Sequence, residues 1–158
     1  EPQDFRMNSL VRGLVSASEF DLDVKRKPIT IKTSFGWPDG KDSLFSDSEK
    51  ISHILACLLE NAIRFTASGE IEIGYSDDEN CVTFFVKDTG IGISEEKQKM
   101  LFTKFMSNSS YTIVSGEGPG LGLYMASGLA QLIGAKLWLE STGPEGSLFC
   151  LSISKLNV

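Results

Sequence analysis

Residues 46–66, with the sequence SDSEKISHILACLLENAIRFT, predict one amphipathic helix around which the rest of the chain is organised. Ser46 followed by Glu49 fits a capping box, and no proline or glycine interrupts the stretch. Asn61 and Arg64 stand about one turn apart at the edge of the apolar stripe, so an amide and a cation project together. The apolar side chains recur at the helical period, at Ile51, Ile54, Leu55, Leu58, Ala62 and Phe65.

The composition limits the class of protein. With 158 residues, 41% hydrophobic and 23% charged, the chain predicts a single globular domain, residues 1–158, excised from a longer protein because it begins at Glu1. The net charge of -6 argues against a general nucleic-acid surface, and no apolar run reaches the roughly 18 residues of a membrane span. Cys57, Cys81 and Cys150 form no CxxC pair and predict thiols of a reducing compartment.

Alternating and helical patterns flank the central helix. Strands are predicted over residues 28–35, 44–45, 70–75, 82–88, 136–140 and 147–154. Further helices are predicted over residues 5–20, 94–105 and 121–133. This uneven interleaving predicts an α+β fold, a two-layer sandwich with helices on one face of a mixed, mostly antiparallel sheet.

Three later stretches carry polar chemistry. In DTGIGI, residues 88–93, a carboxylate at a strand exit can accept a hydrogen bond from an exocyclic amine, and the glycines let the backbone approach. In GEGPGLGL, residues 116–123, alternate glycines before a helix suit an anion, although neither a Walker A nor a Rossmann pattern is present. LFTKF, residues 101–105, places a cation between two aromatics. Each stretch alone also fits a turn, a hinge or core packing.

In this order, LLENAIRFT, DTGIGI, LFTKF and GEGPGLGL resemble the N, G1, F and G2 boxes of the ATP-binding domain of sensor histidine kinases. That domain belongs to the GHKL superfamily, which has the Bergerat ATP-binding fold. DFRMNSLVRGLV and GAKLWLESTGPEGSLFCLSI resemble its entry segment and closing hairpin, so the resemblance covers essentially the whole chain.

The resemblance implies a function, cofactors and partners. ATP and Mg²⁺ would be the cofactors, and the γ-phosphate would pass to a histidine on a separate dimerisation domain that this chain lacks. The implied partners are that phospho-acceptor domain and a response regulator receiver domain, with no nucleic acid. The resemblance further implies a cytoplasmic domain of a homodimeric parent protein, which could be membrane-anchored.

Roles for single residues also follow from the resemblance. Asn61 would coordinate Mg²⁺, Arg64 and Lys104 would contact the phosphates, and Asp88 would accept a hydrogen bond from the adenine amino group. Ser147 would join Asp88 at the adenine through water. Phe102 and Phe105 would anchor a glycine-rich lid over the phosphates. The other implied nucleotide-binding residues are Phe65, Gly90, Gly92, Ile93, Gly116, Gly118, Gly120, Leu121, Gly122 and Leu123.

Departures from the family pattern leave alternatives open. Cys57 stands where histidine kinases usually have another asparagine, and Pro119 stands where threonine or serine is common. Gyrase-like and MutL-like hydrolases carry a glutamate at the position of Cys57, and a thiol there cannot replace that general base. The residues after His53 do not continue as a phospho-acceptor motif. A degenerate nucleotide-sensing or protein-interaction module and an anti-sigma-type serine kinase remain the alternatives.

Overall fold

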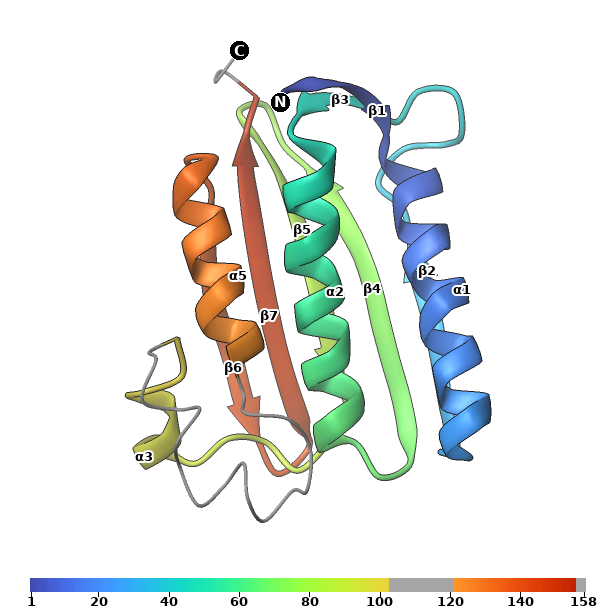
Figure 1. The fold of residues 1–158 in the computed structure, drawn as a ribbon, viewed down its shortest axis with the longest axis vertical. Coiled ribbons are helices and arrows are strands. Elements are labelled where there is room, and N and C mark those ends of the chain that lie inside the picture. Colours follow the sequence, from blue (N-terminus) through green and yellow to red (C-terminus); the bar gives the residue numbers. More distant parts are fainter. Residues whose placement is uncertain (103–120, 156–158) are drawn as a thin grey trace.

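The computed structural model describes residues 1–102 and 121–155. These residues form two layers, with helices α1 (Met7–Lys25), α2 (Ser48–Phe65) and α5 (Leu121–Leu132) covering one face of a sheet (Figure 1). The sheet has five strands in the order β2 (Ile29–Ser34), β4 (Gly69–Asp77), β5 (Cys81–Asp88), β7 (Gly146–Ser154) and β6 (Lys136–Gly143).

The sheet is mixed. Strands β2 and β4 pair in parallel, whereas the β4–β5, β5–β7 and β6–β7 pairings are antiparallel. The predicted fold class, helices on one face of a mixed and mostly antiparallel sheet, is therefore confirmed. None of the helices in the described residues has the length and hydrophobicity needed to cross a bilayer.

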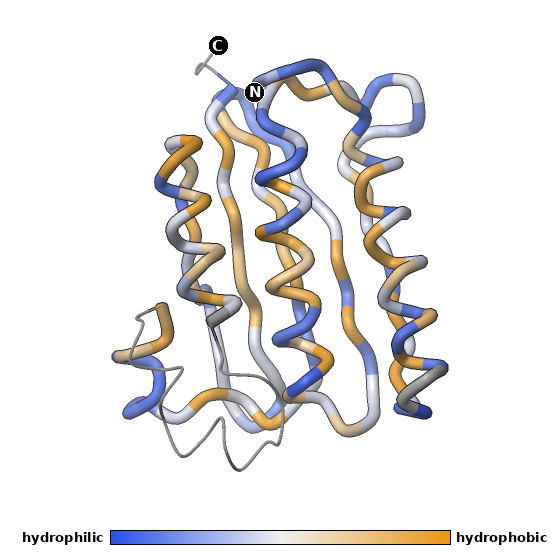
Figure 2. Tube along the Cα trace, viewed as in Figure 1, coloured by the Kyte–Doolittle hydropathy of each residue, from blue (hydrophilic) through white to orange (hydrophobic). Residues whose placement is uncertain are grey.

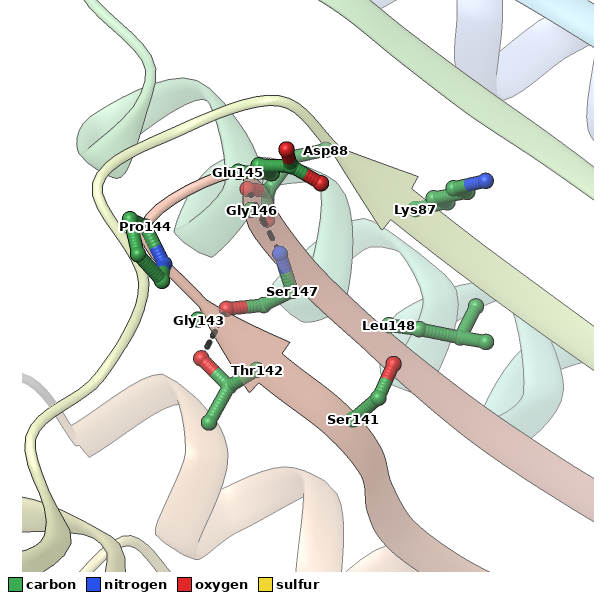
Figure 3. Close-up of a pocket in the computed structure, with 10 residues that line it drawn as sticks. All are labelled: Lys87, Asp88, Ser141, Thr142, Gly143, Pro144, Glu145, Gly146, Ser147 and Leu148. Atoms are coloured by element: carbon green, nitrogen blue, oxygen red, sulfur yellow. Dashed lines mark hydrogen bonds between the residues drawn. The ribbon is translucent and has the colours of Figure 1, made fainter.

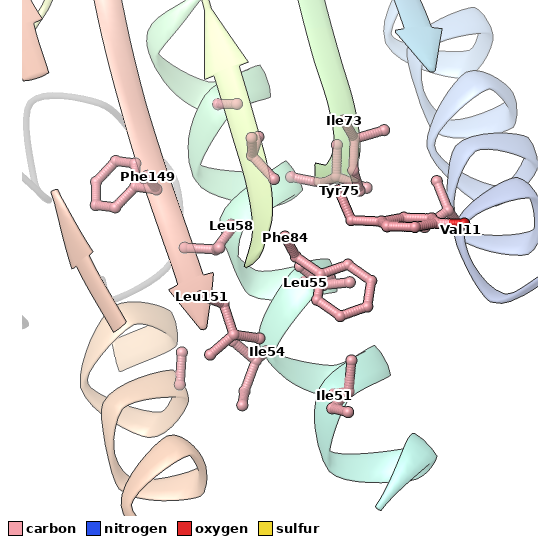
Figure 4. Close-up of a cluster of buried hydrophobic side chains, with 14 of the residues drawn as sticks. Val11, Ile51, Ile54, Leu55, Leu58, Ile73, Tyr75, Phe84, Phe149 and Leu151 are labelled. Atoms are coloured by element: carbon pink, nitrogen blue, oxygen red, sulfur yellow. The ribbon is translucent and has the colours of Figure 1, made fainter. Parts of the chain in front are cut away.

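The core lies between the helices and the sheet (Figure 4). Apolar residues recur along α2 after a polar first turn (Figure 2), and the apolar stripe faces the sheet as its period predicts. Burying one large apolar side chain stabilises a fold by about 1.5–3 kcal/mol, so this layer holds α2 firmly. The side chains of α2 that the core buries are Ile51, Ile54, Leu55, Leu58, Leu59, Ala62 and Ile63.

The start of α2 differs from the prediction. Asp47 is the N-cap, and its side chain accepts the Lys50 N–H over 3.1 Å, so the capping box at Ser46 is wrong. Ser46 instead ends β3 (Ser43–Ser46), which pairs with β1 (Gln3–Arg6) and commits its backbone to a strand. The Lys50 ammonium also lies 2.8 Å from the Asp47 carboxylate. Hydrogen bonds from the Lys50 ammonium and from the Lys50 backbone N–H lower the pKa of the Asp47 carboxyl well below the ordinary aspartate value.

Two other helices have different lengths from those predicted. Helix α1 runs to Lys25 rather than to residue 20, because Leu22 continues the buried face. Helix α3 (Glu95–Gln98) keeps the predicted cap, since the Ser94 hydroxyl accepts the Lys97 N–H over 3.3 Å. It ends early, and turns follow at residues 99–102; residues 103–105 of the predicted helix lie outside the described residues.

Candidate functional site

Most of the described residues that the sequence singled out lie at one end of the sandwich. The C-terminal end of α2, the loop after β5, the start of α5 and the β6–β7 turn meet there (Figure 1). They enclose a cavity of about 450 Å³. Among its lining residues are the predicted site residues Asn61, Phe65, Gly92, Ile93 and Leu123.

A second cavity of about 580 Å³ adjoins the first (Figure 3). Gly143 and Pro144 of the β6–β7 turn line both cavities. Asp88 and Ser147, the two predicted adenine-binding residues, line the second one. The structure thus brings seven of the predicted site residues to two neighbouring cavities that share one turn.

The Asp88 carboxylate is held in a fixed orientation. Its Oδ1 accepts the Gly90 N–H over 2.9 Å and the Ser147 N–H over 3.2 Å, while no described residue donates to Oδ2. The side chain is only 4% exposed. Burial raises the pKa of the Asp88 carboxyl, and the two N–H groups partly oppose this rise. Asp88 therefore presents one open acceptor oxygen at the end of β5.

Thr142 joins this arrangement, and sequence reasoning missed it. Its hydroxyl accepts the Ile93 N–H over 2.8 Å and lies 2.7 Å from the Ser147 hydroxyl. The loop after β5 and the β6–β7 hairpin are thus tied through one side chain. No local pattern marks Thr142, because it stands in the turn-like run TGPEG.

Glycine at two positions allows the loop after β5 to pack closely. Gly92 has φ +79°, and a Cβ atom there would lie 2.1 Å from the Gly143 carbonyl oxygen. A Cβ atom on Gly90 would lie 2.2 Å from the Phe65 carbonyl oxygen. The same oxygen accepts the Ile91 N–H over 3.2 Å, so the loop is fastened to the C-terminal end of α2. A larger residue at Gly92 would push the hairpin away.

The polar residues of α2 take different positions. Asn61 is 8% exposed yet lines the 450 Å³ cavity, whereas Arg64 is half-buried and lines neither cavity. Lys97, which the sequence did not suggest, is half-buried and lines the same cavity as Asn61. It supplies a cation at this wall.

Cys57 lies beneath the start of α5. A Cβ atom built on Gly122 would be 3.9 Å from the Cys57 sulfur. Burial raises the pKa of the Cys57 thiol, and the Glu60 carboxylate raises it further, so the thiol is protonated at neutral pH. Glu60 is exposed and Cys57 half-buried, as expected for residues that face different ways on the helix. Neither is placed as the general base of a hydrolase.

Some predicted site residues have no described geometry. Leu121 is the first residue of α5. Five further predicted site residues lie outside the described residues: Lys104, Phe105, Gly116, Gly118 and Gly120. Within the described residues, no group of three or more His, Cys, Asp or Glu could hold a metal ion.

Comparison with known proteins adds the family. The sequence profile described as histidine kinase-, DNA gyrase B-, and HSP90-like ATPase matches residues 46–157. The circadian input-output histidine kinase CikA of Synechocystis sp. is 31% identical over 157 residues, which are 98% of this chain and 20% of that protein. The sensor protein TorS of Escherichia coli is 36% identical over 132 residues, which are 82% of this chain and 14% of that protein.

Solved structures agree with the sequence matches. The catalytic domain of the histidine kinase ThkA superposes with a TM-score of 0.78 at 26% identity, over 98% of this chain and 96% of that chain. The chain therefore spans a fifth or less of the length of the curated relatives named above, but nearly the whole of a solved catalytic domain.

Proposed function

Because the chain belongs to the family of histidine kinase-, DNA gyrase B- and HSP90-like ATPases, we propose that it binds Mg-ATP as the catalytic domain of a sensor histidine kinase. In that role it would donate the γ-phosphate to a histidine on a separate dimerisation domain. One observation carries the proposal: Asp88 presents a single open carboxylate oxygen beside the cavity that Asn61 lines.

Where the base binds, Asp88 would select adenine over guanine. An ionised carboxylate only accepts hydrogen bonds, so it suits the exocyclic amine of adenine and not the O6 carbonyl of guanine. The N–H groups of Gly90 and Ser147 occupy Oδ1 and leave Oδ2 for that amine. The rise in the pKa of Asp88 is opposed by these same bonds, which help to keep the carboxylate charged.

At the phosphate end, Asn61 would hold the magnesium ion that accompanies ATP, and Arg64 would contact the phosphates. The bound ion would neutralise phosphate charge. Gly122 lies in the first turn of α5, where backbone N–H groups and the helix dipole favour an anion. Binding roles for Lys104, Phe105, Gly116, Gly118 and Gly120 rest on the sequence resemblance alone.

The partners are inferred from relatives. The histidine kinase ThkA has been solved in complex with the response regulator protein TrrA, and this chain covers 42% of that kinase. By analogy, the partners of the present chain are its own dimerisation domain and a response regulator receiver domain. We further infer a cytoplasmic location, where ATP is available and three unpaired cysteines stay reduced.

Cys57 favours one other function specifically. A protonated thiol cannot supply the amide that the family usually has one turn before Asn61, so a nucleotide-sensing module without phosphoryl transfer would tolerate it. The two functions differ in one property. A kinase domain passes phosphate to an acceptor domain supplied in trans, whereas a sensing module only binds nucleotide.

Calorimetric titration with ADP and with an unhydrolysable ATP analogue, each with and without Mg²⁺, tests the binding. We expect saturable, Mg²⁺-dependent binding at micromolar to sub-millimolar affinity. Incubation with ATP and the acceptor domain of the parent protein then tests phosphoryl transfer. Absence of binding by either nucleotide would overturn the proposal, and binding without transfer would favour the sensing module.

A further inference from the structure

Thr142 lies where the β6–β7 hairpin meets the loop after β5. Its hydroxyl accepts the Ile93 N–H over 2.8 Å. The same oxygen lies 2.7 Å from the Ser147 hydroxyl, and the Ser147 N–H reaches Asp88 Oδ1 over 3.2 Å. A continuous set of hydrogen bonds thus runs from the loop through Thr142 and Ser147 to Asp88. Figure 3 shows Thr142, Ser147 and Asp88 of this set.

The hydrogen count of this set matters. A hydroxyl has one donor hydrogen and two acceptor lone pairs. The Ile93 N–H takes one lone pair of Thr142, which leaves its hydrogen and the other lone pair for Ser147. If Thr142 donates to Ser147, then Ser147 keeps its own hydrogen to donate elsewhere. If Ser147 donates to Thr142, then Ser147 can only accept from a ligand.

Adenine is complementary to only one of these two arrangements of the hydroxyl hydrogens. Its edge presents an amine donor beside the N1 acceptor, so the complementary site is an acceptor beside a donor. Asp88 supplies the acceptor, and Ser147 supplies the donor only when Thr142 donates to it. Thr142 and Ser147 both line the cavity that Asp88 lines, so the pair stands at the right end of the site.

We propose that Thr142 is a positioning residue for adenine recognition, which directs the Ser147 hydrogen, directly or through water, towards N1 of the base. This inference rests on the proposed function and deepens it. Thr142 acts through Ser147 and the loop at Ile93, without touching the nucleotide itself. The Thr142 hydroxyl then has two roles: it binds the loop at Ile93, and it orients the hydroxyl of Ser147.

The test compares ADP with inosine diphosphate, whose base has an N–H where adenine has N1 and a carbonyl in place of the amine. Both affinities are measured by calorimetry for the unmodified chain and for Thr142→Val, Thr142→Ser and Ser147→Ala. Thr83→Val serves as the matched control, because Thr83 is half-buried in β5 and lies five residues before Asp88. Thermal unfolding checks that each variant is folded.

We expect Thr142→Val to weaken ADP binding about tenfold and to reduce the preference for ADP over inosine diphosphate several-fold, through loss of two hydrogen bonds. Thr142→Ser should restore both values to within about twofold, because it keeps the hydroxyl. Thr83→Val should match the unmodified chain. In the Ser147→Ala background, Thr142→Val should not reduce the base preference further, because both changes break the same path.

Some outcomes would overturn the inference. Equal weakening of both nucleotides by Thr142→Val, or wild-type affinities in that variant, would show that Thr142 has no part in base selection. Should Thr142→Val fail to fold, an unchanged base preference in Ser147→Ala would be decisive against it. Failure of the unmodified chain to bind ADP would instead overturn the proposed function.

Discussion

Ser147 donates its backbone N–H to Asp88 Oδ1 over 3.2 Å, and the two residues are direct partners in the β5–β7 pairing. The carboxylate is therefore fixed by the register of two strands that lie far apart in the sequence. Any slip of β7 against β5 would move Ser147 away from the Asp88 carboxylate, so the proposed base-binding end is built into the sheet itself.

Asp88→Asn is expected to weaken ADP binding more than tenfold, which is about 1.4 kcal/mol or more. The amide oxygen can still accept both N–H groups, but an NH₂ group would replace the open oxygen and face the amine of the base. Calorimetry measures the loss. Asp78→Asn is the matched control, because Asp78 also accepts two backbone N–H groups, at 2.8 and 2.7 Å, in the β4–β5 turn. Equal affinities in the two variants would show that Asp88 is a turn residue only.

The same substitution is expected to raise stability at neutral pH. Burial raises the pKa of Asp88 in the folded state, so folding favours its protonated form. The wild-type chain therefore loses stability as the pH rises from the ordinary aspartate pKa through the raised folded value, whereas Asp88→Asn does not. Urea unfolding at a series of pH values should show the variant ahead at pH 7 and the gap closing under acid conditions. A variant that is less stable at pH 7 would contradict this sign.

Gly92→Ala is expected to damage both the fold and the site. The residue has φ +79°, and the new methyl group would lie 2.1 Å from the Gly143 carbonyl oxygen, which is backbone and cannot turn aside. We expect a loss of about 2 kcal/mol or more in the free energy of unfolding, together with loss of ADP binding. Gly128→Ala is the control: nothing lies within 4 Å of its Cβ position in α5, and alanine there should stabilise the helix by about 0.5–1 kcal/mol.

Lys97→Gln is expected to weaken ADP binding about threefold at low salt while adenosine binding stays unchanged, because the lysine lines the proposed nucleotide cavity as a cation. The effect should shrink as the salt concentration rises. Lys99→Gln makes the same change two residues away at an exposed position outside that cavity. If both variants show the same salt dependence of ADP affinity, Lys97 contributes only to the overall electrostatic potential of the protein.

Asp47→Ala is expected to cost about 1 kcal/mol of stability at pH 7, since the N-cap of α2 is lost. The pKa of Asp47 is lowered in the folded state, so its contribution is full above the ordinary aspartate pKa and fades as the pH falls below about 4. Denaturant unfolding at pH 7 and at pH 3 tests both statements. Ser46→Ala should leave the stability nearly unchanged. A loss of stability as large as that of Asp47→Ala would instead support Ser46 as the N-cap of α2.

Sequence reasoning reached the features that depend on local patterns. The period of α2 is long enough to fix its apolar face, and the glycines after Asp88 mark a close approach of backbone. The choice between Ser46 and Asp47 as the cap was missed, because the pairing of β1 with β3 decides it across about 40 residues.

Thr142 was missed for a similar physical reason. One of its hydrogen-bond partners, Ile93, is 49 residues away in the sequence. A hydroxyl in a turn carries no signal of such a distant partner, so its position became visible only when the loop and the hairpin were brought together. Lys97 likewise belongs to the cavity through the fold of α3 and not through any motif.

Hydrogen–deuterium exchange of the Ile91 amide, which donates to the Phe65 carbonyl, can report whether nucleotide is bound. The Ile91 residue is 73% exposed, so slow hydrogen–deuterium exchange of its amide would come from the 3.2 Å bond to the end of α2. That exchange requires the loop to lift from the helix that carries Asn61. A nucleotide that binds only the closed arrangement would slow it by the factor 1 + [L]/Kd. One backbone proton would then measure affinity in the unlabelled chain.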